Sequence, residues 1–201
     1  MSMRAIEGRV LAIWIGTACC VGIAPLRGWI ELDMVRHMLL EFPLLLACGA
    51  MTASVMPPTM TRLFASLDRL GLTGLTLFAC VTAYWMIPAA LDAALSQSTV
   101  AAAKYASLVI AGCALRLSLQ RAPVVLQGFF LGNWAWMTAT VGLLYQETPG
   151  QLCLYYLEDS QLRAGRGLVI AAIVIGAVWC ALAARRWHGE TSASRRYESR
   201  S

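Results

Sequence analysis

Residues 33–55 read DMVRHMLLEFPLLLACGAMTASV, and this stretch decides how the chain folds. At 1.5 Å of rise per residue, a helix of this length crosses a hydrocarbon core of about 30 Å. Its first turns nevertheless carry Asp33, His37 and Glu41, which recur every four residues and therefore lie along one stripe of the helix. Ionisable residues inside a span are costly and usually mark function or a buried partner. The stretch therefore predicts a membrane helix with a polar site at its beginning.

The composition of the chain extends this expectation to the whole protein. Hydrophobic residues make up 59% of the 201 residues and charged residues 13%, against roughly 45–50% and 25% in soluble domains. We expect one transmembrane helical-bundle domain over residues 1–187 and a basic, disordered cytoplasmic tail over residues 188–201. The net charge of +5 does not indicate nucleic acid, because the arginines stand between apolar runs, where they set orientation. The seven cysteines contain no CxxC pair and predict no disulfide framework.

The apolar runs predict an all-α, polytopic bundle of about six transmembrane helices. Eleven of the 16 basic residues fall on the cytoplasmic side, and five outside, when both termini are cytoplasmic. The acids gather toward the outer face and suggest a cation site there. We therefore expect a multi-pass protein of the cell inner (plasma) membrane. The predicted runs are Gly8–Pro25, Val35–Val55, Leu72–Leu95, Val100–Leu117, Val124–Tyr145 and Gly167–Ala184.

The beginning of the second run offers donors for a metal ion. His37 supplies imidazole nitrogen, and Met34 and Met38 supply thioether sulfur at spacings of three and four residues. Thioether with imidazole suits Cu(I), whereas carboxylate with imidazole suits Cu(II) or Zn(II). Asp33 could ligate, or could orient the imidazole ring as an outer partner. The alternative is a structural histidine that is hydrogen-bonded to Asp33 or to a carboxylate of another helix, with the methionines as packing.

Glu41 lies two helical turns deeper than Asp33. A carboxylate at that depth is neutral, paired or exposed to a water-filled cavity. Either a proton or metal role or an interhelical hydrogen bond would account for it. Pro43 follows, frees the carbonyl of Leu39 from its helical hydrogen bond and predicts a kink.

A second polar segment, residues 155–161, precedes the last run. Its Glu158 and Asp159 are expected on the same face as His37, where they could complete a site. Acids at a helix start and tyrosines at a membrane interface are the alternative.

Asn133, inside the fifth run, is interpreted as an interhelical hydrogen-bonding residue. A bis-histidine haem is excluded because His37 and His188 fall on opposite sides, and no phosphate-binding loop or HExxH motif occurs.

Residues 33–40, followed by Pro43-Leu44-Leu45, resemble the signature of CtaG-like cytochrome c oxidase assembly factors, in which a helix reads roughly His-Met-x-x-His-x-Leu-Leu before a Pro-Leu. Residues 158–165 resemble the family's late Asp-Gln-Gln-x-x-Gly. The resemblance implies a non-enzymatic role in helping copper reach the oxidase. His37 matches the second histidine of the signature and Asp159 its aspartate. Asp33 stands where the family has its first histidine, and the family's later histidines have no counterpart.

Three hypotheses follow. The first is a membrane factor that handles copper at the outer face through His37, Asp33, Met34, Met38 and Asp159, with membrane lipid and a complex such as a terminal oxidase as partners. The second is a non-catalytic accessory subunit of a respiratory or other membrane complex. The third is a small proton-coupled carrier in which Glu41 titrates. None of them predicts an enzyme or a nucleic-acid partner.

Overall fold

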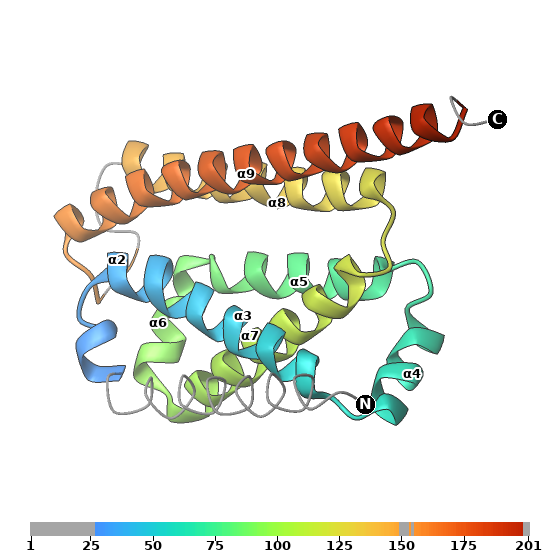
Figure 1. Ribbon diagram of the computed structural model, residues 1–201. Helices are drawn as coiled ribbons and strands as arrows, with labels where there is room; N and C mark the ends of the chain where they lie inside the picture. Colours follow the sequence, from blue (N-terminus) through green and yellow to red (C-terminus); the bar gives the residue numbers. More distant parts are fainter. Residues whose placement is uncertain (1–26, 149–152, 154, 199–201) are drawn as a thin grey trace.

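The computed structural model describes residues 27–148, 153 and 155–198, with side chains described as far as Arg185. Every regular element in this part of the chain is a helix, as the sequence predicts (Figure 1). Its elements in chain order are α2 (Met34–Arg36), the π-helical turn η1 (His37–Glu41), α3 (Phe42–Val55), α4 (Pro58–Leu67), α5 (Leu72–Trp85), α6 (Pro88–Ser96), α7 (Ser98–Leu119), α8 (Val124–Glu147) and α9 (Glu158–Glu198).

The helices form two layers, which Figure 1 shows one above the other. α8 packs along α9 in one layer, and α7 packs between α3 and α5 in the other. Glycines permit both close pairings. A Cβ at Gly49 would overlap the carbonyl oxygen of Val109, and a Cβ at Gly142 would lie 2.7 Å from the carbonyl oxygen of Gly165. Small residues at such crossings let backbones approach, which is the usual basis of helix association in membranes.

Three helical segments among the described residues are long and apolar enough to cross a membrane. They are Met34–Val55, Ser98–Leu119 and Glu158–Arg185. The pair α4 and α5, bent by 89° at its break, would make a fourth if it were one span. The three segments contain the predicted runs at 35–55, 100–117 and 167–184, and they indicate a membrane protein. The predicted run at 8–25 lies outside the described residues.

Three boundaries differ from the sequence-based expectation. The run at 72–95 is not one helix, because α5 ends at Trp85 and α6 begins at Pro88. Pro88 has no N–H to donate and holds Ile87 extended, with φ −75° and ψ 127°. α4 forms where only a break was expected. α9 continues through Glu198, into the segment expected to be a disordered tail, and no proline after residue 149 stops it.

The main core cluster surrounds the beginning of the first described span. Met34 and Met38 are buried there against Trp85 of α5, Leu91 of α6 and Tyr156. The same region contains the π-helical turn, which ends two residues before Pro43. Pro43 cannot donate to the Leu39 carbonyl, so the regular α-helical ladder is interrupted where the turn widens. This widened turn sets the positions of His37 and Glu41.

Candidate functional site

The centre of the site is Lys104, near the start of α7, whose side chain is completely buried. Its Nζ atom lies 3.0 Å from Oε1 of Glu31, 2.9 Å from Nε2 of His37 and 3.2 Å from Oε1 of Glu41. An ammonium group has three N–H donors, and three groups surround it. A charged lysine inside a membrane protein is stable only with such partners.

Glu31 connects the site to the protein surface. It belongs to the turn before α2, and its side chain is 11% exposed, whereas those of His37 and Glu41 are completely buried. Arg27 donates from Nε to Oε2 of Glu31 at 2.7 Å and from its terminal nitrogen to the Ala94 carbonyl at 3.2 Å. The two carboxylates are therefore balanced by two cations, Arg27 and Lys104.

His37 is held on both sides of its ring. Nε2 lies 2.9 Å from the Lys104 ammonium, which can only donate, and 3.3 Å from Oε2 of Glu41; because the contact with the ammonium is the shorter one, we assign Nε2 as the acceptor and place the ring proton on Nδ1. Nδ1 then donates to the hydroxyl oxygen of Tyr156 at 2.5 Å. The edge of the ring also packs on Phe42, with 5.7 Å between ring centroids. The histidine is thus fixed as a neutral imidazole by groups from three parts of the chain.

Ser160, in the first turn of α9, joins the two sequence segments that carry the family resemblance. Its hydroxyl donates to Oδ1 of Asp33 at 2.6 Å and accepts from the backbone N–H of Met34 at 3.0 Å. Asp33 also caps α2 by accepting from the N–H of Val35. Burial raises the pKa of the Asp33 carboxyl, but the hydrogen bonds from Ser160 and Val35, together with the charges of Arg163 and Arg36, lower it overall. Asp33 therefore anchors the helix start, and Tyr156 rather than Asp33 orients the His37 ring.

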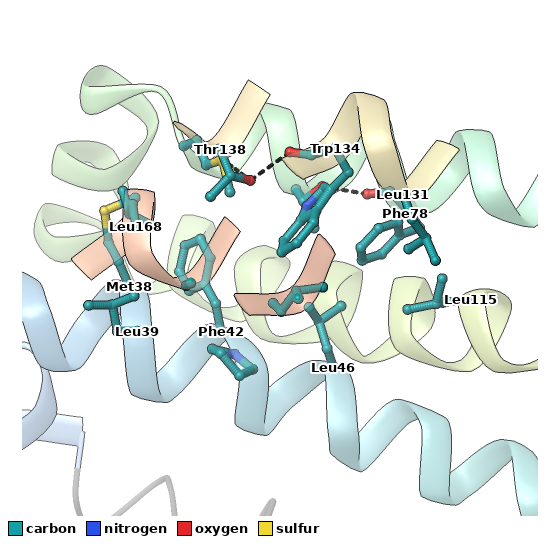
Figure 2. A pocket seen from close by; sticks show the side chains of 15 residues that line it. Met38, Leu39, Phe42, Leu46, Phe78, Leu115, Leu131, Trp134, Thr138 and Leu168 are labelled. Carbon is teal, nitrogen blue, oxygen red and sulfur yellow. Dashed lines mark hydrogen bonds between the residues drawn. The ribbon is translucent and has the colours of Figure 1, made fainter. Parts of the chain in front are cut away.

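The predicted site residues separate into two groups. His37 and Glu41 meet at Lys104, and Met34 is buried in the core beside them. Met38 is also buried but lines an apolar cavity, where Figure 2 shows it near Leu168.

The remaining predicted residues lie elsewhere. Asp159 and Glu158 are exposed and line a separate pocket with Glu147 at the end of α8. Asn133 is exposed on α8, so it does not lie in a buried helix contact. Asp159 and Asn133 therefore have different surroundings from those we expected.

Sequence reasoning missed Glu31, Lys104 and Tyr156. A signal existed for Lys104, because it is the only lysine of the chain and lies inside a predicted span. In the sequence-based interpretation Lys104 contributes only to the predicted orientation, as one of the five basic residues on the outer side. Tyr156 is one of the tyrosines that the alternative interpretation assigns to a membrane interface, but it is buried, and burial with the Glu31 and Glu41 charges raises the pKa of its hydroxyl. Its neighbour Tyr155 is exposed.

The donor set partly fits the metal ion that the resemblance implies. One ligand atom each from Glu31, His37 and Glu41 can be chosen so that all lie within 4.8 Å of one another. Such carboxylate and imidazole donors suit Cu(II) or Zn(II), whereas Cu(I) prefers sulfur. The Lys104 ammonium already stands within hydrogen-bond distance of the same three groups. A metal ion therefore fits here only in exchange for that ammonium.

No family model, curated protein or solved structure matches this chain. The resemblance of residues 33–45 and 158–165 to oxidase assembly factors therefore stays a prediction. The function has to be inferred from the site itself, with that resemblance as a guide to the metal.

Proposed function

We propose that this protein is an integral membrane factor that handles copper at the Lys104 site, exchanging the metal ion for the ammonium group. The observation that carries the proposal is the contact of one buried ammonium with Glu31, His37 and Glu41 at 2.9–3.2 Å. The site is arranged to stabilise a cation at that point. The oxygen and nitrogen donors favour Cu(II), and the resemblance to assembly factors supplies copper as the metal and a terminal oxidase as the recipient.

Because the metal ion replaces the Lys104 ammonium group, metal affinity depends on pH in a definite direction. A metal ion and an ammonium cannot share one position, so Lys104 has to lose its proton or move away when the metal binds. The proton has a route to water through the partly exposed Glu31. Metal affinity is therefore expected to rise with pH, with release of about one proton per ion bound.

We also propose a six-span topology with both termini cytoplasmic, in the inner membrane. The site joins the beginnings of three candidate spans, since His37, Lys104 and Ser160 all lie within the first seven residues of theirs. Three spans that begin on one side require a return crossing between each pair. The run at 72–95 and α8 supply these crossings, and the run at 8–25 supplies the sixth. The arginine distribution then puts the site on the outer side.

Metal content of purified protein tests the proposal. Wild type, Lys104→Met, Lys104→Arg and His37→Ala would be loaded with Cu(II), and separately with Cu(I) under reducing conditions, before elemental analysis. Lys104→Met removes the competing charge and should bind copper at least about tenfold more tightly than wild type. Lys104→Arg keeps a cation that cannot be deprotonated, and His37→Ala removes a donor, so both should bind little. Absence of copper from folded Lys104→Met would overturn the proposal.

A second candidate, a small proton-coupled carrier, is favoured by the same network, because every partner of Lys104 is titratable and Glu41 is fully buried. Proton uptake into proteoliposomes, followed with an internal pH dye, tests this function. Glu41→Gln should abolish a pH-driven flux, whereas Glu147→Gln, outside the network, should not. A flux that Glu41→Gln leaves unchanged would exclude the carrier.

A further inference from the structure

An apolar cavity of about 270 Å³ lies between the two helix layers (Figure 2). Side chains from α3, α5, α7, α8 and α9 line it, among them Phe42, Leu46, Phe78 and Leu168. Three of these helices are in the candidate membrane spans. An apolar cavity of roughly 150 Å³ stays free of water and accommodates benzene. This cavity is larger, so it can hold a longer hydrocarbon segment.

Polar atoms at the cavity wall are mostly used within their own helices. Thr82 donates to the Phe78 carbonyl at 2.8 Å, and Thr138 donates to the Trp134 carbonyl at 2.8 Å. The exception is Nε1 of Trp134, a buried N–H donor with no hydrogen-bond partner among the described residues. Figure 2 shows the Trp134 side chain reaching from α8 into the space above Leu46. A buried donor without an acceptor is unfavourable and indicates a missing partner.

The cavity has an edge toward the surface of the bundle. Ile175 of α9, which lines it, is 40% exposed, and Leu39 and Leu131 are half-buried. Nearer the Lys104 site, Gly167 lies so close to Leu39 that a Cβ would overlap the Leu39 side chain. Access is therefore from the side, along α9 beyond that contact, where a membrane-spanning helix faces lipid.

We propose that the cavity binds one lipid chain that carries a carbonyl oxygen, such as an acyl ester, with the Trp134 indole N–H donating to that oxygen. The apolar lining accommodates the hydrocarbon chain, and the unpartnered indole N–H donates to the ester carbonyl oxygen. The lateral opening admits a molecule that arrives from the bilayer. The inference goes beyond the proposed function, since it involves none of the Lys104 ligands.

Photolabelling of the full-length protein in detergent tests this inference. One probe is a fatty-acid methyl ester with a diazirine on its chain, and the other is an alkane of equal length with the same diazirine. Mass spectrometry then locates the labelled residues. In wild type the ester should label the segments around Phe42 and Trp134, and unlabelled methyl ester should compete. Labelling that does not saturate, or that is confined to outward residues such as Ile170, would overturn the proposal.

Three variants separate filling of the cavity from loss of the hydrogen bond. Ala171→Phe fills the cavity and should lower labelling by both probes at least about tenfold. Ala181→Phe makes the same change on an exposed position of α9 and should have no effect. Trp134→Phe removes the N–H together with the second ring of the indole but keeps an aromatic side chain at the wall, so ester labelling should fall about threefold to tenfold while alkane labelling persists.

Equal effects of Trp134→Phe on both probes would exclude the hydrogen bond. Unchanged labelling in Ala171→Phe would exclude the cavity. Ala171→Leu serves the same purpose if the phenylalanine variant elutes as an aggregate, and copper content measured in parallel should not follow the labelling.

Discussion

Helix α7 has a buried polar cluster at each end, and the two clusters are built differently. Lys104, near its start, contacts Glu31, His37 and Glu41, which are all titratable side chains. Ser118, near its end, donates to the buried carboxylate of Asp68 at 2.5 Å. The same carboxylate accepts from the backbone N–H groups of Thr73 at 2.9 Å and Gly74 at 3.3 Å. The Lys104 cluster can therefore change its protonation, whereas the hydroxyl and backbone N–H groups that donate to Asp68 cannot lose their protons.

The Asp68 cluster has a structural explanation. Gly71 has φ +75°, a conformation that favours glycine, and it turns the chain into α5. The first N–H groups of α5 then have no partner within the helix, and the Asp68 carboxylate accepts from two of them. The bond to Ser118 joins this cap to α7. The Asp68 cluster therefore stabilises the fold without offering a site for a further ion. The Lys104 cluster instead stabilises an ammonium group, whose charge is lost when its proton leaves.

The largest expected effect is that of Lys104→Met on stability. Removing the ammonium leaves two carboxylates, of Glu31 and Glu41, facing each other in a buried site. Breaking a buried ion pair on one side typically costs about 3–5 kcal/mol. Unfolding in detergent, followed by circular dichroism, should show this loss, and the double variant with Glu41→Gln should recover part of it. A cost smaller than that of Asp68→Ala would reverse the ranking of the two clusters.

Tyr156→Phe tests how the His37 ring is held. Without the hydroxyl, Nδ1 loses its acceptor and the ring can turn or change tautomer. Loss of such an outer partner typically lowers metal affinity by about 10–100-fold. Copper titration should show this reduction in the Lys104→Met background, where binding is strongest. Tyr155→Phe, at the exposed neighbour, is the matched control and should leave affinity unchanged; equal effects of the two would remove Tyr156 from the site.

Asp68→Ala should affect stability alone. The variant loses the cap of α5 and the bond to Ser118, which together are worth about 1–2 kcal/mol. Unfolding measurements should show that loss, while copper content per folded protein stays at the wild-type value. A change in copper content would mean that the two ends of α7 are coupled and that the contrast between them is wrong.

Much of the fold could be predicted from the sequence, because apolar runs and their breaks are local. The runs at 35–55, 100–117 and 124–145 lie within one or two residues of helix ends. His37 and Glu41 were found for the same reason, since four-residue spacing fixes a shared face. Lys104 was missed as a partner because the rotation of α7 about its axis depends on packing against α3, through contacts such as Gly49 on Val109.

The second polar segment, residues 155–161, shows the same limit of sequence-based prediction for single residues. Tyr156 and Ser160 point inward, whereas Asp159, one residue before Ser160, is exposed. Successive helical residues differ by about 100° in direction, so a shift of one residue moves a side chain from the site to the surface. The sequence indicated that this segment packs near His37, but its charge directed attention to Asp159, whereas packing buries the neighbouring Ser160.

The smallest expected effect concerns Asp33, which joins α2 to α9 and lies outside the spans. Its pKa is lowered from 3.8 in the folded protein, so it contributes stability that is complete above pH about 4 and is lost as pH falls through the lowered folded value. The contribution is under about 1 kcal/mol, because the carboxylate remains partly exposed. Unfolding of wild type, Asp33→Asn and Ser160→Ala at pH 5 and pH 2.5 measures it. Wild type should lose more stability than either variant on acidification. Equal losses in all three would mean that the ionised Asp33 does not hold the two motif segments together, and the contact between α2 and α9 would then depend on packing around Met34 alone.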